Sequence, residues 1–223
     1  MGTYNGRLSP ALSFAARPKC GIRKSRAITI LKPDMDCCEN AEELRKILEA
    51  AKALSPAVNA VGREIVSALR SGGKILTCGN GGSAADALHM SEEFVGRFSR
   101  ERRSLPAVCL CADPTLLTCI LNDYGADRVF SRQVESLGQE GDLLFGFTTS
   151  GNSPNVAEAF SAAKKKGVKT VLVSGKGGGR LRGVADFELI VPSGSTARIQ
   201  EVHTLFLHSW LEAVDEAFAC PEE

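Results

Sequence analysis

The sequence predicts an α/β domain built as a three-layer, doubly wound parallel sheet. Short, mostly apolar runs alternate with segments of helical periodicity, which is typical of strands covered by helices on both faces. Two turns rich in glycine and hydroxyl groups each follow an apolar run and precede a helical segment. Such turns occur at the carboxyl ends of parallel strands. No internal repeat or interdomain linker interrupts the alternation, so one domain is expected.

Two helices, expected to form an N-terminal hairpin, come first. Asn40 with Glu43 three residues later is the pattern of a capped helix start. Apolar side chains then recur at helical spacing at Leu44, Ile47, Leu48 and Ala51. Proline is favoured in the first turn of a helix, so Ser55-Pro56 predicts the start of the second helix, and Gly72-Gly73 predicts its end.

Strands and helices alternate after this pair. The expected strands are Lys74–Cys78, Ala107–Cys111, Asp142–Phe147, Thr170–Ser174 and Phe187–Val191. The expected helices are Ala84–Phe98, Thr115–Leu121, Arg128–Leu137, Asn155–Lys166 and Arg198–Phe218. Strands that alternate with helices in this way form a parallel sheet with helices on both sides.

Composition excludes several classes of protein. No apolar run approaches the roughly eighteen residues of a membrane span, so no membrane partner is expected. Residues 1–33 hold seven basic side chains and no acid, which leaves 20 basic against 26 acidic side chains in the remainder. A domain with this excess of negative charge is a poor match for nucleic-acid phosphates. The eight cysteines include no C-x-x-C pair, which favours a reduced, intracellular and cytoplasmic protein over a zinc knuckle or a redox centre.

The chain is expected to divide into a basic, unpatterned and disordered extension over residues 1–38 and a domain over residues 39–223. The extension is rich in Arg, lacks acids and superficially resembles an organellar transit peptide. The alternative, which we favour, is an untranslated or disordered leader with Met35 as the true start, because helical sequence begins just after it.

The two turns are the first candidates for chemistry. Gly79-Asn80-Gly81-Gly82-Ser83 follows the first strand, and its glycines let the backbone approach a ligand, although a plain tight turn has the same composition. Ser83 with Asp86 is expected to cap the next helix. Thr148-Thr149-Ser150-Gly151-Asn152-Ser153 offers hydroxyls and a helix N-terminus, a neutral cradle for phosphate. The glycine-rich segment 175–179 is expected to be mainly a flexible connection.

Polar groups on two helices are the next candidates. His89 and Glu93 lie four residues apart and share a helix face, so they suit a metal or a base with its partner, or simply a surface contact. Gln200 and His208 are eight residues apart and can both face inward on the last helix. His203 points elsewhere and is expected to be structural or exposed.

The motifs together resemble those of a known family. Cys-Gly-Asn-Gly-Gly-Ser at 78–83 is similar to the first loop of sugar isomerase (SIS) domains, which have a flavodoxin-like fold. The further strings at 88–93, 122–125, 149–153 and 198–203 resemble the phosphoheptose isomerases. The similarity covers about residues 40–218 and keeps the motifs in the family's order.

The resemblance implies an aldose–ketose isomerase that converts sedoheptulose 7-phosphate into D-glycero-D-manno-heptose 7-phosphate through an enediol, in the first step of heptose biosynthesis for lipopolysaccharide. It implies a homotetramer with sites at subunit contacts and one zinc ion per subunit. The matching zinc ligands are His89, Glu93, Gln200 and His208. The matching substrate contacts are Asn80, Gly81, Gly82, Glu93, Asn122, Asp123, Thr148, Thr149, Ser150, Ser153 and Gln200. Glu93 is the expected base and His208 the expected acid.

One departure from the family pattern and two rival functions remain at this stage. Ala197 stands where some members carry an acid, which leaves one sugar contact open. A non-catalytic SIS-fold protein, such as a DnaA-binding replication initiation factor, shares much of the sequence but lacks the complete set of His89, Glu93, Gln200 and His208. A sugar-phosphate-sensing regulator would carry a helix-turn-helix domain, for which the N-terminal extension is too short and unpatterned.

The leader generates the first testable prediction. A chain that starts at Met35 should fold, assemble and turn over like the full chain, because residues 1–34 show no motif and no periodicity. Size-exclusion chromatography and an isomerase assay on both chains would check this. A loss of assembly or activity in the shorter chain would assign the leader a structural role.

Overall fold

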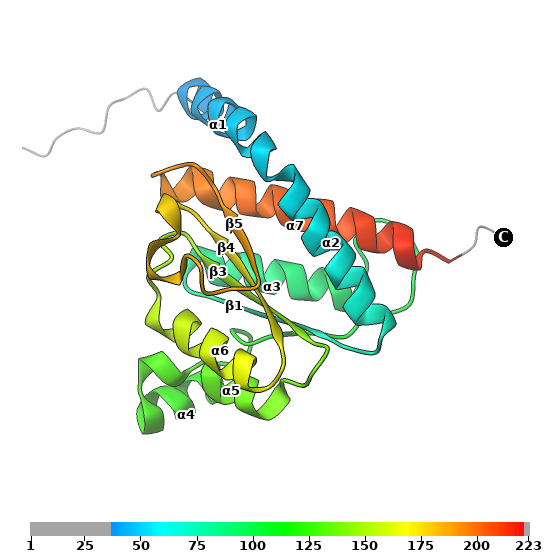
Figure 1. Cartoon of the computed structure of the whole chain (residues 1–223), viewed down its shortest axis with the longest axis vertical. Coiled ribbons are helices and arrows are strands. Elements are labelled where there is room, and N and C mark those ends of the chain that lie inside the picture. Colours follow the sequence, from blue (N-terminus) through cyan, green and yellow to red (C-terminus); the bar gives the residue numbers. More distant parts are fainter. Residues whose placement is uncertain (1–36, 221–223) are drawn as a thin grey trace, which may run out of the picture. The chain divides into compact units, whose positions relative to one another are not determined.

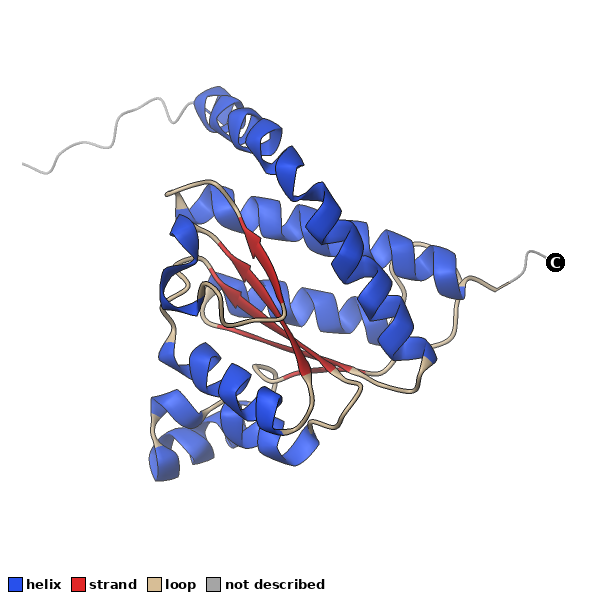
Figure 2. Cartoon of the chain, in the orientation of Figure 1, coloured by secondary structure: helices blue, strands red, loops and turns tan. Residues whose placement is uncertain are grey.

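The computed structural model describes residues 37–220, which form a parallel five-stranded sheet between two layers of helices (Figures 1 and 2). The strands lie in the order β2-β1-β3-β4-β5, and each neighbouring pair is parallel. Their bounds are β1 Ile75–Gly79, β2 Ala107–Cys109, β3 Leu143–Thr148, β4 Lys169–Ser174 and β5 Phe187–Ile190. This is the strand order of flavodoxin-like sheets, so the predicted fold class is confirmed.

The helices divide between the two faces of the sheet. One face carries α1 (Cys37–Ala51), α2 (Ser55–Arg70), α3 (Gly82–Val95) and α7 (Thr196–Phe218). The other carries α4 (Pro114–Tyr124), α5 (Ser131–Leu137) and α6 (Pro154–Lys165). The 3-10 helices in the described part are η1 (Lys52–Leu54), η2 (Ala126–Arg128) and η3 (Lys176–Leu181). The predicted strands and helices are found within about three residues of their expected bounds.

The hydrophobic core lies on both faces of the sheet. Phe145 packs toward α2, α3 and α7, whereas its neighbour Leu144 packs toward α5 and α6. Because successive side chains of a strand point to opposite faces, a strand buried on both faces needs apolar residues at consecutive positions. On the first face, the indole N–H of Trp210 donates to the carbonyl of Val58 at 3.0 Å and ties α7 to α2.

Two expectations about the N-terminal helices are wrong. α1 begins at Cys37, so Asn40 lies inside the helix and does not cap it. The predicted hairpin is also absent, because the backbone stays right-handed helical at Ala51, Leu54 and Ser55. The 3-10 turn η1 therefore joins α1 to α2 end to end, as Figure 1 shows. Ser55 does begin the second helix as expected.

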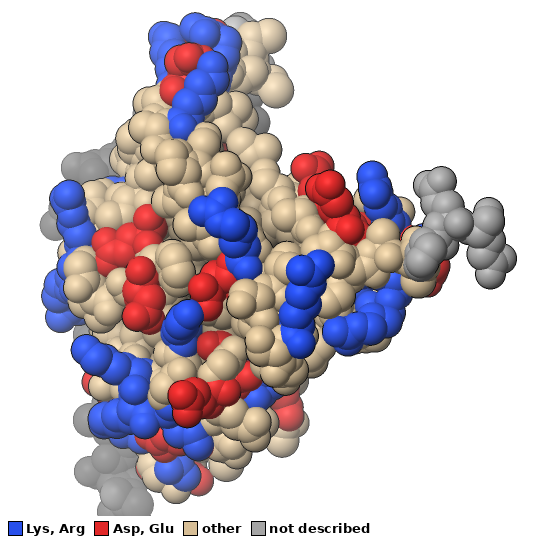
Figure 3. Space-filling model, turned by 45° about the vertical axis from the view of Figure 1, so that its right-hand side comes forward, with Lys and Arg blue, Asp and Glu red and all other residues tan. Residues whose placement is uncertain are grey.

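The predicted extension over residues 1–38 falls outside the described residues, apart from Cys37 and Cys38, which belong to α1. The leader and its boundary with the domain stay predictions. Among the helices of residues 37–220, none is long and apolar enough to cross a bilayer. On the face drawn in Figure 3, basic and acidic side chains are interspersed, unlike the basic stripe that tracks a nucleic-acid backbone.

Candidate active site

The first glycine loop joins β1 to α3. Helix α3 begins at Gly82, and Gly81 before it has φ of +59°, a conformation that favours glycine. Ser83 therefore lies within the first turn, where it is buried, and the expected cap by Ser83 with Asp86 is wrong. The backbone closes the loop instead, since the N–H of Ser83 donates to the carbonyl of Asn80 at 3.1 Å.

The hydroxyl-rich turn joins β3 to α6. Thr148 ends the strand and Ser153 precedes the helix, and their hydroxyl groups share a hydrogen bond of 2.9 Å. Thr149 and Ser150 lie between them at half-buried positions, and Ser150 Oγ accepts from the N–H of Asn152 at 3.2 Å. No side chain caps α6. A helix start without a side-chain cap keeps N–H groups available to an anion.

The parallel pairing of β1 with β3 places the two turns side by side. Gly79 at the end of β1 is in register with Phe147 near the end of β3. The side-chain amides of Asn80 and Asn155 then exchange two hydrogen bonds, of 3.0 and 2.9 Å, and so link the first loop to the first turn of α6. Sequence reasoning missed Asn155, because an Asn just after Ser153-Pro154 matches no motif.

The third glycine segment, Gly175–Gly179, is not the flexible connection that was expected. It packs so closely on the hydroxyl-rich turn that a Cβ at Gly151 would lie 1.9 Å from the carbonyl oxygen of Gly178. The backbone N–H of Arg180 donates to Asn152 Oδ1 at 3.0 Å, and its guanidinium donates to the Asn152 carbonyl at 3.2 Å. Arg180 is thus a cation beside the turn that the sequence analysis did not single out.

Helices α3 and α7 bring three predicted groups together. His89 Nε2 lies 3.5 Å from Glu93 Oε1, one helical turn away on α3. The His208 ring on α7 lies 5.1 Å from the His89 ring, edge to face, and 5.3 Å from the ring of Phe98, centroid to centroid. The His89 and Glu93 side chains keep 35% and 18% of their surface exposed, so a ligand can reach them.

The same region offers suitable ligands for a metal ion. His89, Glu92 and Glu93 place ligand atoms within 4.8 Å of one another. Sequence reasoning missed Glu92, although its position three residues after His89 places it on the same side of the helix. Imidazole nitrogens and carboxylate oxygens are the ligands that zinc takes besides cysteine. The donors present therefore fit a zinc ion.

Gln200 lies at the opposite end of α3 from Glu93. A Cβ at Gly82 would come within 2.2 Å of Gln200 Nε2, so glycine at that position makes room for the amide. Gln200 and His208 are separated on α7 by about 12 Å of helical rise. The structure thus brings Gln200 to the first loop and away from the cluster of His89, Glu93 and His208.

His203 is fully buried. Its Nε2 lies 3.2 Å from the carbonyl oxygen of Ser174, and its Nδ1 lies 3.9 Å from the carboxylate of Asp86, which is also buried. The expectation of a structural role for His203 agrees with this position between β4 and α3.

Asn122 and Asp123 lie on α4, in the helix layer opposite α3 and α7. Both are exposed, and the Asn122 amide donates to Asp123 Oδ1 at 2.8 Å. Asp127, four residues later, lines a cavity of about 250 Å³ together with residues 151–154 and Arg180. Asn122 and Asp123 are therefore separated by the sheet from His89 and His208, while the segment that follows them approaches the hydroxyl-rich turn.

A pair of thiols supports the first loop from β2. The N–H of Cys111 donates to Cys109 Sγ at 3.4 Å, and the Cys111 thiol lies 3.3 Å from the Gly79 carbonyl oxygen. Hydrogen bonding from Cys111, through its thiol and its backbone N–H, lowers the pKa of Cys109 against the effect of burial. The same interaction and burial raise the pKa of Cys111.

Comparison with known proteins identifies the family. The model of the SIS domain matches residues 39–175. Phosphoheptose isomerase 1 of Campylobacter jejuni is 48% identical over 177 residues, which cover 79% of this chain and 95% of that protein. The chain belongs to the phosphoheptose isomerase family. The resemblance inferred from the motifs is thereby confirmed, and the chain is an isomerase.

Solved structures of phosphoheptose isomerases agree with this assignment. The enzyme from Neisseria gonorrhoeae superimposes with a TM-score of 0.76 at 40% identity. The enzyme from Francisella tularensis superimposes with a TM-score of 0.78 at 37% identity. Each match covers 80% of this chain and 96% of the other.

The thiol pair generates a prediction about pH. The rate at which iodoacetamide alkylates Cys109 should level off at a lower pH than it does for an ordinary cysteine, because the thiolate is the nucleophile and the pKa of Cys109 is lowered. In Cys111→Ala the levelling-off should move toward the ordinary cysteine pKa of about 8.5. Peptide mass spectrometry of pulse-labelled protein measures both profiles. Identical profiles in the two proteins would contradict the assigned cause.

Proposed function

We propose that this chain converts sedoheptulose 7-phosphate into D-glycero-D-manno-heptose 7-phosphate through an enediol, with the assistance of zinc. The observation that carries the proposal is the meeting of Glu93, His89 and His208 on two helices that begin near a hydroxyl-rich turn. Membership of the phosphoheptose isomerase family supports the same substrate.

The residues fit the proton transfers that the reaction needs. Aldose–ketose isomerisation moves a proton between adjacent carbons, so it requires a base for the C–H proton and an acid for the carbonyl oxygen. Glu93 takes the proton from the carbon next to the carbonyl, and His208 supplies a proton to the carbonyl oxygen, which forms the enediol. Glu93 then gives its proton to the former carbonyl carbon, while His208 takes back a proton from the hydroxyl on the neighbouring carbon. The other sugar forms, both residues regain their starting protonation, and no atom is gained or lost.

His89, Glu93 and His208 would hold the zinc ion, one per subunit. When bound, zinc would polarise the carbonyl oxygen and stabilise the negative charge that develops on it. Gln200 matches a fourth ligand in the family, but its amide lies against Gly82. About 12 Å of helical rise separates Gln200 from His208, farther than a glutamine side chain extends, so within one chain Gln200 serves as a substrate contact. Glu93 has to act both as ligand and as base.

The two turns would hold the rest of the substrate. We assign the phosphate to Thr148, Thr149, Ser150 and Ser153 with the start of α6, because hydroxyls and helix N–H groups bind phosphate without a cation. Asn80, Gly81, Gly82 and Gln200 would contact the sugar hydroxyls from the first loop. Asn122 and Asp123 would contact substrate from the α4 side.

A homotetramer with active sites at subunit contacts is part of the proposal. Leu88 and Val95 on α3 and Leu205 on α7 are 42%, 50% and 47% exposed, close in sequence to His89, Glu93 and His208. A second subunit that covers these apolar side chains would lie next to the site. The proposed setting is the cytoplasm and the first step of heptose synthesis for lipopolysaccharide, with no nucleic-acid or membrane partner.

The rival function, a non-catalytic DnaA-binding protein of the same fold, has no observation in its favour. Its members lack the complete set of polar groups, whereas this chain carries His89, Glu93, Gln200 and His208. A coupled assay on sedoheptulose 7-phosphate separates the two functions.

The base assignment predicts the behaviour of Glu93→Gln. This change keeps the shape of the side chain and removes the basic carboxylate, so kcat should fall by about 10²–10⁴, the usual contribution of a general base. His208→Gln should also be severely impaired. The double variant should lose much less than the product of the two single losses, because the residues act as a unit. Steady-state kinetics with zinc present measures all three.

Glu212→Gln is the matched control, because Glu212 is exposed on α7 one turn beyond His208. It should keep the wild-type kcat. An undiminished Glu93→Gln would remove Glu93 as the base but leave the isomerase. An inert wild type, tested with and without added zinc, would overturn the proposed function itself.

The phosphate assignment predicts a change in KM. Ser150→Ala or Ser153→Ala should each raise KM about tenfold, the effect of losing one hydrogen bond to a charged group, about 1.5 kcal/mol. Ser161→Ala, exposed on the far side of α6, is the control and should leave KM unchanged. If neither Ser150 nor Ser153 affected KM, the phosphate would have to bind elsewhere.

A further inference from the structure

A buried arginine lies at the end of α3, next to the proposed site. The side chain of Arg102, in the segment between α3 and β2, has no exposed surface. Its Nε donates to Asp215 Oδ1 on α7 at 2.8 Å, and the Asp215 side chain is 2% exposed. Taking two charges out of water is costly and is offset only when the remaining donors and acceptors are also paired.

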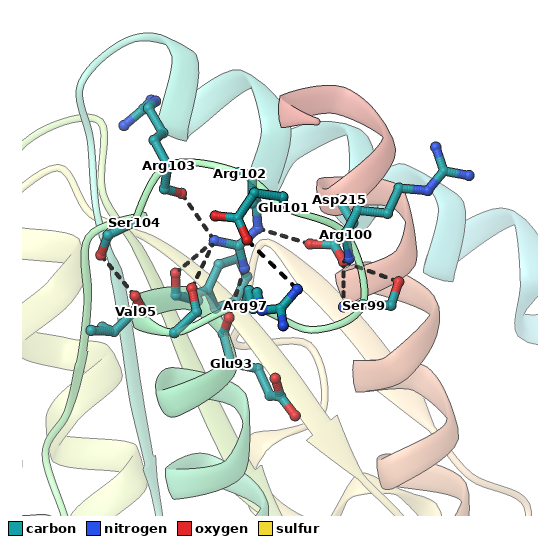
Figure 4. A network of polar contacts seen from close by, with 12 residues as sticks. Glu93, Val95, Arg97, Ser99, Arg100, Glu101, Arg102, Arg103, Ser104 and Asp215 are labelled. Carbon is teal, nitrogen blue, oxygen red and sulfur yellow. Dashed lines mark hydrogen bonds and ion pairs between the residues drawn. The ribbon is translucent and has the colours of Figure 1, made fainter. Parts of the chain in front are cut away.

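The other Arg102 donors are paired with the end of α3. One terminal nitrogen donates to the carbonyl of Glu93 at 2.6 Å, and the other donates to the carbonyls of Phe94 at 3.0 Å, Arg103 at 3.1 Å and Gly96 at 3.4 Å (Figure 4). The last carbonyls of a helix have no partner within the helix and carry its negative dipole end. A planar guanidinium can satisfy several of them at once.

Both oxygens of the Asp215 carboxylate also accept hydrogen bonds. Its Oδ2 accepts from the backbone N–H groups of Ser99 at 2.7 Å and Arg100 at 2.8 Å, and from the Ser99 hydroxyl at 3.2 Å. Burial by itself would raise the pKa of Asp215, but these hydrogen bonds and Arg102 lower it overall. The carboxylate therefore stays charged and fixes the loop that leaves α3.

This ion pair lies close to the two residues assigned to proton transfer. The Glu93 carbonyl is a direct acceptor of Arg102, so the guanidinium fixes the backbone of the residue whose side chain is the proposed base. Asp215 follows His208 by seven residues on α7, about two helical turns. The pair thus joins the end of α3 that carries Glu93 to the helix that carries His208.

We propose that Arg102 and Asp215 are positioning residues that set the spacing between Glu93 and His89 on α3 and His208 on α7. This inference rests on the proposed function of those three groups. Misplacing a catalytic group by about 1 Å can cost on the order of 10²-fold in rate. Neither Arg102 nor Asp215 touches substrate in this assignment, and both act through the helix ends.

Arg102→Lys, Arg102→Met and Asp215→Asn test the proposal. Lysine keeps the charge but cannot reach Asp215 and several carbonyls together. Each variant should lower kcat about 10- to 100-fold with little change in KM, and should weaken zinc binding by about tenfold, the range found for groups that orient metal ligands. Zinc affinity is measured by competition with a chromogenic chelator, and circular dichroism confirms folding at the assay temperature.

Asp142→Asn is the matched control, because it breaks another ion pair whose carboxylate is buried. Lys74 Nζ lies 2.6 Å from Asp142 Oδ2, and the Asp142 side chain is 3% exposed. The pair joins residues just before β1 and β3, at the opposite edge of the sheet from the glycine loop. Asp142→Asn should lower Tm to a similar degree as Asp215→Asn, yet leave kcat and zinc affinity near wild type.

The outcomes separate the two proposals. If Arg102→Lys and Asp215→Asn lost no more kcat and zinc affinity than Asp142→Asn, the pair would be merely structural and the positioning role would be overturned. If Arg102→Met failed to fold, Arg102→Lys and Asp215→Asn would still test the positioning role. An inert wild type would overturn the isomerase, whereas the zinc affinities of the same variants would still test the positioning role, and unchanged affinities would reject it.

Discussion

The parallel pairing of β1 with β3 is the constraint on which the site depends. Parallel strands end at the same edge of a sheet, so the loops after β1 and β3 are adjacent although 65 or more residues separate them. The register of Gly79 with Phe147 brings Asn80 within hydrogen-bonding distance of Asn155. A shift of one residue in that pairing would reverse which face each side chain points to. After such a shift Phe145 and Leu144 would exchange the faces on which they are now buried, and each would have to pack against the other helix layer.

Glycine shapes the loops mainly by making room for another segment, and Gly81 and Gly151 also adopt a positive φ. At Gly82 a Cβ would overlap the Gln200 amide, and at Gly151 it would overlap the Gly178 carbonyl. In both places the missing side chain lets a segment from far along the chain come into contact. The first contact draws α7 onto the loop before α3, and the second covers the hydroxyl-rich turn with the segment after β4.

The sequence predicted the sheet and the chemical groups but not the contacts that support them. The strands could be predicted because burial on both faces requires consecutive apolar residues. The pairing of His89 with Glu93 could be predicted because residues four apart share one face of a helix. The predicted hairpin was wrong because the backbone stays right-handed helical through Lys52–Leu54, and no residue pattern there indicates this. Asn155, Glu92 and Arg102 were missed for a common reason. Their roles come from partners that are brought close by folding, and Arg102 finds its carboxylate 113 residues away.

Helices α3 and α7 hold the groups that make these contacts at fixed distances from one another. They run side by side in the same direction, since Gln200 lies on Gly82 and His208 lies on His89. From Gly82 to His89 the rise along α3 is about 10 Å. Gln200 against Gly82 fixes the two helices at the loop end, and Arg102 with Asp215 fixes them at the other. Because a helix is stiff over two turns, the loop before α3 and the cluster of His89, Glu93 and His208 keep a set separation. A ligand that engages both has to be elongated, and the proposed substrate, an open-chain sugar phosphate, is elongated in this way.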